Sequence, residues 1–221
     1  MATHTPDYLM TAEEAKNHYR YMKPHGVYCA GERIAEKDYG RYILDYAEVC
    51  SGIVEYHTHE ATPAELASAA RAKTDYENRE HCKRIAEGLE AYTNGSAYRC
   101  PECGEVHNFE DYEMTEHENA DGGTCYQCPN CNAELCESDL EAVDVYDYFS
   151  DCLDIEFRCG SDKEFRSVRI MVTCGGPNIY IDTATKQVEL YWWGDRASYP
   201  ISYDAAAAVD EWAEEYWGCL Q

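Results

Sequence analysis

The stretches CPECG (residues 100–104) and CPNCN (residues 128–132) decide how the middle of this 221-residue chain folds. Each is a Cys-Pro-x-Cys knuckle followed by a small residue, and 24 residues separate the two cysteine pairs. Zinc prefers four soft ligands at tetrahedral angles, and two tight turns can supply two thiolates each. Gly104 and Asn132 suit a turn that needs a positive φ. We therefore predict a zinc ribbon over residues 98–137, with one structural Zn²⁺ held by Cys100, Cys103, Cys128 and Cys131.

Three nearby side chains are alternative ligands. Cys125 precedes Cys128 at the same Cys-x-x-Cys spacing and can therefore replace Cys131 as a ligand. The proline inside the second knuckle repeats the first knuckle, which favours Cys131. His107 and His117 lack a knuckle context, so we expect both to be surface residues. Because four thiolates leave no open coordination position, the zinc is expected to be structural rather than catalytic.

The charge of the chain is concentrated around these knuckles. The sequence has 43 acidic and 18 basic residues, a formal charge of −25, and residues 100–157 hold 17 of the acids with no Lys or Arg. A solvated surface normally mixes both signs. Two explanations for this run are open. The acids either keep the protein soluble, or they form a surface that imitates the phosphates of nucleic acid and binds a partner with a basic groove. Direct binding to nucleic acid is not expected, because the phosphates would be repelled.

The predicted partner-binding residues are acids of this run. Six lie between the knuckles, where a hairpin or loop should project: Glu110, Asp111, Glu113, Glu116, Glu118 and Asp121. Five follow the second knuckle, where we expect a short helix around residues 141–152: Glu137, Asp139, Glu141, Asp144 and Asp147. At helical spacing Glu137, Glu141 and Asp144 share one face, as do Asp144 and Asp147, so these residues would form a second acidic row.

Residues 1–97 are expected to form a helical region. The capping-box pattern from Thr11 to Glu14 starts a helix that ends near residue 21. A second helix is predicted over residues 32–48, although Gly40 weakens it. Thr62, Pro63 and Glu65 form a strong start signal for a long helix to about residue 92. Its thin apolar side favours a break near residue 75.

Residues 138–221 are expected to form an α+β layer. Alternating hydrophobicity predicts a four-strand antiparallel meander over residues 153–158, 165–173, 179–181 and 188–193, with a turn at residues 175–178. Ser202 or Asp204 then caps a C-terminal helix that runs to about Trp217. The fold class is therefore α+β, with a helical N-terminal part, a four-cysteine zinc ribbon and a meander packed on the C-terminal helix.

Other motifs carry less information about chemistry. At period two, Tyr191 and Trp193 share one face of their strand and Trp192 the other, so one face offers an aromatic patch to a protein partner. His57 and His59 have the spacing of a metal pair on a strand, but nothing nearby in the sequence completes it. No nucleophile, phosphate-binding loop or cofactor motif is recognisable, so we predict no catalytic or cofactor-binding residue and no enzyme activity.

The 13 cysteines are expected to be reduced thiols and metal ligands in the cytoplasm. The first thirty residues show no basic-then-apolar leader. No apolar run approaches the ~20 residues of a membrane span. Without secretion, a disulfide framework is not expected.

The segments VTCGGPNIYID (residues 172–182) and VELYWWGDRA (residues 188–197) resemble small acidic proteins of bacterial phages and mobile elements. The resemblance covers about the last 50 residues, and the zinc ribbon would be an insertion. It implies an inhibitor of host defence nucleases, of the anti-CRISPR or anti-restriction type, acting in the bacterial host cell. Such nucleases hold nucleic acid in basic channels. The first hypothesis is therefore a non-enzymatic DNA mimic, and the alternative is a zinc-ribbon adaptor that binds a protein partner through the aromatic sheet.

Overall fold

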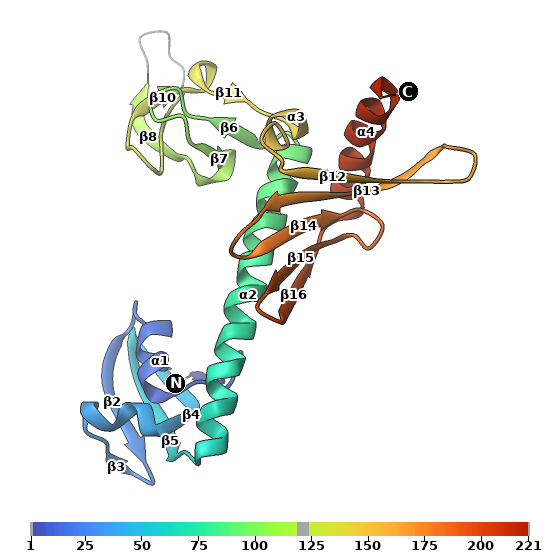
Figure 1. Cartoon of the computed structure of the whole chain (residues 1–221). Coiled ribbons are helices and arrows are strands. Elements are labelled where there is room, and N and C mark those ends of the chain that lie inside the picture. Colours follow the sequence, from blue (N-terminus) through green and yellow to red (C-terminus); the bar gives the residue numbers. More distant parts are fainter. Residues whose placement is uncertain (1, 119–123, 221) are drawn as a thin grey trace. The chain divides into compact units, whose positions relative to one another are not determined.

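The computed structural model describes residues 2–118 and 124–220 and has the predicted α+β class (Figure 1). The chain divides into two compact units, Met1–Asn78 and Arg79–Gln221. The division falls inside α2 (Pro63–Thr93), a 31-residue helix that runs without the expected break. Its start is the predicted capping box, in which the Thr62 N–H donates to Glu65 at 2.7 Å. None of the helices in the described ranges is both long and apolar enough to cross a membrane.

The N-terminal unit is built on a five-stranded mixed sheet with the strand order β1-β4-β5-β2-β3. The strands are β1 (Ala2–His4), β2 (Lys23–Cys29), β3 (Glu32–Arg33), β4 (Tyr42–Cys50) and β5 (Ile53–Glu60). Strands β2 and β5 pair in parallel, and the other neighbours pair antiparallel. Helix α1 (Ala12–His18) begins at the predicted cap Thr11 and packs Ala12 and Ala15 into one core with Val54 and Tyr56.

The expected helix over residues 32–48 is wrong, so the N-terminal region is not helical throughout. This stretch forms β3, the 3₁₀-helix η1 (Glu36–Arg41) and β4. Tyr42, Ile43 and Tyr46 of this stretch are aromatic or β-branched side chains, and such residues favour strands. Strand β4 pairs with β1 on one side and with β5 on the other, and these backbone hydrogen bonds favour a strand over a helix at residues 42–50.

The ribbon region contains two three-stranded sheets, with the orders β11-β6-β7 and β10-β9-β8. The elements are β6 (Ala97–Arg99), β7 (Val106–Asn108), η2 (Phe109–Asp111), β8 (Glu113–Glu118), β9 (Thr124–Gln127), β10 (Glu134–Cys136), η3 (Glu137–Asp139) and β11 (Glu141–Ala142). Its core joins Tyr112, Leu135 and Leu140 to two buried cysteines, Cys100 and Cys128. The ribbon therefore has a small core of its own.

The C-terminal sheet has five antiparallel strands in sequence order. They are β12 (Asp154–Cys159), β13 (Phe165–Thr173), β14 (Asn178–Asp182), β15 (Gln187–Trp192) and β16 (Asp195–Pro200). One face packs against α2 and against α4 (Tyr203–Cys219), so that Ile170, Ile181 and Leu190 lie in one core with Leu89 and Val209 (Figure 1). The four predicted strands and the C-terminal helix are confirmed, and Ser202 is the cap.

Strand β16 is an element that was not predicted from the sequence. It follows β15 after a turn at Trp193 and Gly194, whose φ values of 47° and 99° suit a tight hairpin. Trp193 is therefore in the turn, 89% exposed, and not on a strand face with Tyr191 as expected. Only Ala197 and Tyr199 of β16 pack against the core, so the apolar alternation of this strand is weak.

Candidate metal centre

The two knuckles are the turns of two short hairpins. Strands β6 and β7 flank the first knuckle, and β9 and β10 flank the second. Pairing of the flanking strands fixes the ends of each turn, so the cysteines of a knuckle are held on the same short loop. Each hairpin is too small to bury a core by itself. The ribbon is therefore stabilised by what joins the two hairpins.

Both knuckles have the same backbone hydrogen bonds. The N–H of the first cysteine, Cys100 or Cys128, donates to the carbonyl five residues later, at 2.9 Å in each case. The N–H four residues later donates back to that cysteine, at 2.9 Å from Gly104 and 3.0 Å from Asn132. The φ values of Gly104 and Asn132 are 75° and 58°, which confirms the positive φ predicted for both.

The four predicted cysteine sulfurs come together between the hairpins. Their Sγ atoms all lie within 4.8 Å of one another. The Sγ atoms of Cys100 and Cys131 are 3.8 Å apart, as are those of Cys103 and Cys128. An ion bound tetrahedrally at about 2.3 Å needs sulfur–sulfur distances of about 3.8 Å. Each of these close pairs joins one hairpin to the other, so a bound ion would cross-link them.

Local burial and backbone hydrogen bonding shift the pKa values of the Cys100 and Cys103 thiols in opposite directions. The N–H of Glu105 donates to Cys103 and lowers the pKa of this thiol to about 7. Burial raises the pKa of the Cys100 thiol. Cys100 and Cys128 are fully buried, whereas Cys131 is exposed at the edge of the site. Because the thiolate is the form that binds metal, the amide at Cys103 favours the ligand form of that residue.

Aromatic side chains surround the cysteines and were not predicted from the sequence. The ring of Phe109 lies 5.3 Å from that of Tyr98 and 5.1 Å from that of Tyr126. Tyr112 is buried beside the cysteines, and burial, followed by the charge of Cys128, raises the pKa of its hydroxyl to about 12. The signal in the sequence was the density of aromatic residues next to the knuckles, which a ribbon with little other apolar content needs for its core.

Of the alternative ligands, Cys125 and His107 are outside the cluster of metal-ligating side chains. Cys125 is directly opposite Cys136 in the β9–β10 pair, and His117 belongs to β8. His107 is half-buried, which differs from the expected surface position, and its ring lies 5.8 Å from that of Tyr112. Over the described ranges, the metal-ligating cluster at the knuckles consists of the four cysteines predicted.

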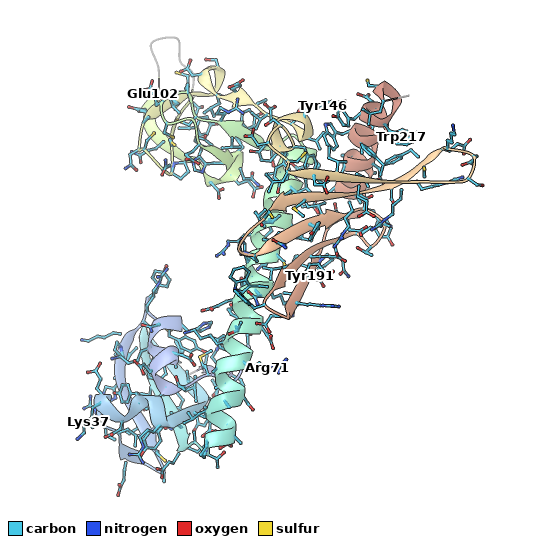
Figure 2. The ribbon with its side chains drawn as sticks, viewed as in Figure 1. Lys37, Arg71, Glu102, Tyr146, Tyr191 and Trp217 are labelled. Carbon is cyan, nitrogen blue, oxygen red and sulfur yellow. The ribbon has the colours of Figure 1, made fainter. Side chains whose placement is uncertain are left out.

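The acids of residues 100–157 lie at the surface wherever their side chains are described. Thirteen of the 17 acids belong to this described set, and every one is exposed, including Glu102 at the first knuckle (Figure 2). Seven of the predicted partner-binding residues are among them: Glu110, Asp111, Glu137, Asp139, Glu141, Asp144 and Asp147. Glu113, Glu116 and Glu118 belong to β8, and Asp121 lies outside the described residues.

The expected helix around residues 141–152 is mostly wrong, and with it the predicted second acidic row. Residues 137–139 form η3, residues 141–142 form β11, and only α3 (Val145–Tyr148) is α-helical. The reason is local capping. Asp144 accepts the N–H of Tyr146 at 2.8 Å, and Asp139 accepts that of Cys136 at 3.0 Å. Such side-chain bonds compete with a continuous helix.

Arg99, one residue before the acidic run, pairs with two of its members. Its guanidinium lies 3.1 Å from Glu141 and 3.4 Å from Asp147. Together with the caps at Asp139 and Asp144, these pairs give four of the five predicted partner-binding acids after the second knuckle a role in the local fold. Acids nearer the knuckles, such as Glu110, are therefore the better candidates for partner contact.

No protein-family model matches this sequence, and no curated protein or solved structure matches it either. The cysteine cluster and the acidic surface must therefore be interpreted from their own geometry and charge. Eight of the thirteen described acids lie between residues 98 and 142, in the same ribbon as the cysteines.

Proposed function

We propose that the ribbon, held by one structural zinc ion, is a rigid acidic module that occupies the basic nucleic-acid groove of a nuclease. The observation that carries this proposal is the exposure of all thirteen described acids in a stretch without a single Lys or Arg. Surfaces that serve solubility alone normally mix both signs. A surface that carries only negative charge attracts a groove lined by Lys and Arg on another protein.

Zinc is the ion proposed for the four cysteines. Structural zinc sites are closed and tetrahedral, and four thiolates at these sulfur separations match that geometry. Iron can also occupy a tetrahedral set of four sulfurs, so metal analysis of the purified protein decides between them. Four thiolates around a divalent ion add a net charge of about −2 to the ribbon.

Rigidity supports binding by charge. A disordered acidic tail loses conformational entropy when it docks, whereas a folded ribbon has lost that entropy already. The aromatic core and the cross-linked hairpins hold exposed acids such as Glu102 and Glu110 on ordered backbone. The carboxylates are therefore presented at fixed spacing, as phosphates are along a nucleic acid.

The proposed targets are host defence nucleases of the Cas or restriction type, and the proposed location is the cytoplasm of a bacterial host cell. These enzymes bind nucleic acid through positively charged channels. The resemblance of residues 172–197 to small phage and mobile-element proteins supports the same class of target. The proposed activity is binding and competition, without catalysis.

The test measures DNA cleavage by a purified Cas9-type effector and by a purified restriction endonuclease, with and without this protein. Four ribbon acids are reversed together to Lys: Glu102, Glu110, Asp111 and Glu137. We expect inhibition by the parent protein, weakened by salt, and a loss of about 100-fold or more in the variant, because like charges that face each other cost several kcal/mol.

The matched control reverses four exposed acids outside the ribbon: Glu32, Glu164, Glu211 and Glu214. This control makes the same change in net charge and should still inhibit. Equal loss in both variants would mean that only total charge matters. Unchanged inhibition by the ribbon variant, or no inhibition by the parent, would refute the mimicry proposal.

A second candidate function, a protein-binding adaptor, is favoured by the aromatic end of the β15–β16 hairpin. Trp193 is 89% exposed, and Trp192 packs so closely on Gly176 that an added Cβ would lie 2.8 Å from its ring. Tyr191, labelled in Figure 2, lies on the same hairpin, with Arg196 5.5 Å from its ring centroid. In the same assay, Trp193→Ser should leave inhibition unchanged; loss of inhibition would favour the adaptor.

A further inference from the structure

Strand β5 presents a second group of metal-ligating side chains, in the N-terminal unit. Its side chains alternate, with Val54 and Tyr56 buried in the core beside α1. Glu55 and His57 therefore point to the opposite face of the sheet and are half-buried. The spacing in the sequence had paired His57 with His59, but His59 is engaged elsewhere, by Asp45 at 2.7 Å and Glu65 at 3.3 Å.

The neighbouring strands place a second carboxylate beside these residues. In the β4–β5 register, Glu48 is directly opposite Glu55, and Tyr46 is opposite His57. One ligand atom from each of Glu48, Glu55 and His57 lies within 4.8 Å of the others. Ligand atoms about 2.1 Å from an ion lie about 3 to 4 Å apart, so the three side chains are near the spacing of a coordination sphere.

The ring of His57 is held in place by aromatic stacking. Its centroid lies 4.5 Å from that of Tyr46, with an interplanar angle of 11°, and 6.1 Å from that of Tyr28. Its Nε2 atom is buried and has no hydrogen-bond partner among the described residues. A buried ring nitrogen without a partner is unfavourable, and a metal ion is a partner that would satisfy it.

A bound cation would also reduce the repulsion between the carboxylates of Glu48 and Glu55. Like charges directly opposite each other on paired strands are destabilising. A bulge in β2 leaves His25 without a partner in the strand register. The Nδ1 atom of His25 lies 2.8 Å from a carboxylate oxygen of Glu55. The Nδ1 atom of His25 thus orients Glu55, in the way that groups outside the coordination sphere orient metal ligands. Glu48 has no ion pair in the part of the chain that the structure describes.

We infer that Glu48, Glu55 and His57 bind one divalent first-row transition ion, with water completing its coordination. Two carboxylates and one imidazole suit ions such as Zn²⁺, Co²⁺ and Mn²⁺. This donor set differs from that of the ribbon, whose thiolates select softer metals. The inference concerns the other unit of the chain and does not depend on the proposed function of the ribbon.

The test titrates Co²⁺ into full-length protein loaded with a single equivalent of Zn²⁺ per chain, which the four cysteines take up first, and binding is measured by calorimetry and by absorption spectroscopy. We expect one Co²⁺ to bind per chain in addition to the zinc. The spectrum should lack the intense sulfur-to-cobalt charge-transfer bands that appear when cobalt replaces zinc on cysteines. Physiological salt in the buffer suppresses diffuse binding of cations to this acidic protein.

The variants Glu48→Gln and Glu55→Gln remove a ligand charge with almost no change in shape. Each should weaken Co²⁺ binding about tenfold or more while circular dichroism stays unchanged. Glu60→Gln, on the same strand but outside the cluster, makes the same charge change and should bind as the parent does. Absence of the extra Co²⁺ in the parent, or equal binding by all three variants, would overturn the inference.

Discussion

Replacement of Cys103 by serine is expected to abolish binding of the proposed zinc ion at the four cysteines and unfold the ribbon, while the C-terminal sheet stays folded. The binding free energy of a structural zinc, about 10–16 kcal/mol, is also folding free energy, because the unfolded chain has no preformed site. The ribbon core and the core of the C-terminal sheet are separate clusters of buried residues. Loss of the ion should therefore melt the ribbon locally.

The four tryptophans make this outcome measurable. Trp192, Trp193, Trp212 and Trp217 all lie in the C-terminal sheet, its turn or α4, so their fluorescence should stay native in Cys103→Ser. Limited proteolysis should cut between residues 98 and 143, and metal analysis should find one equivalent of zinc less per chain than in the parent. Cys159→Ser changes an exposed cysteine outside the cluster and should match the parent in all three measurements. A Cys103→Ser protein that retains stoichiometric zinc and resists protease would contradict the structural role.

Asp182→Asn is expected to destabilise the C-terminal sheet by about 2 kcal/mol, because the buried carboxylate loses its charge-assisted hydrogen bonds from Arg158, whose own side chain is partly exposed. The Asp182 side chain is 4% exposed and receives two hydrogen bonds from Arg158, at 2.9 and 2.7 Å. Arg169 adds a third contact at 3.9 Å. Asparagine keeps an oxygen for the N–H of Ala184, so the β14–β15 turn survives, but its amide NH2 replaces the oxygen that accepts a hydrogen bond from Arg158 Nη2.

Urea unfolding followed by tryptophan fluorescence measures this change. The control is Asp162→Asn, which breaks an exposed pair with Arg166 at 2.9 Å and should cost no more than about 0.5 kcal/mol. Similar unfolding free energies for the two variants would show that burial adds nothing to the Asp182 pair.

The same carboxylate gives the sheet an acid-sensitive contribution to stability. Burial by itself would raise the pKa of Asp182, but the hydrogen bonds from Arg158 and from the Thr185 and Ala184 N–H groups outweigh it, and the pKa is lowered. The unfolded chain then binds protons more readily, so this contribution is complete above about pH 4 and is lost as pH falls through the folded-state pKa. Asp182→Asn should therefore lose less stability on acidification than the parent.

Local signals predicted the parts of this fold that local contacts decide. The knuckles, the cap of α2 at Thr62 and the cap of α4 at Ser202 each depend on residues within a few positions, and all were predicted. The strand β4 depends on β1 and β5, and β2 pairs in parallel with β5, so no short window of sequence contains that information. The helix predicted over residues 32–48 was therefore wrong.

The candidate sites show the same difference between features set by nearby residues and features set by strand pairing. The four cysteines were found because their spacing alone brings them together in pairs. The partners of His57 were missed because Glu48 is nine positions away and becomes a neighbour only through strand pairing. Asp139 and Asp144 were assigned to a second acidic row because the sequence does not reveal that their carboxylates accept backbone N–H groups two or three positions away.

Helix α2 makes the boundary between the two units unusual, because the chain has no linker there. Ala69 is buried in the first half of the helix, and Leu89 lies in the core of the C-terminal sheet. Helix formation is cooperative, and a cut at Asn78 would leave two frayed ends that each half must order alone. The two units are therefore poor candidates for exchange as independent modules, and an insertion or recombination point would be better tolerated in a surface turn than at their border.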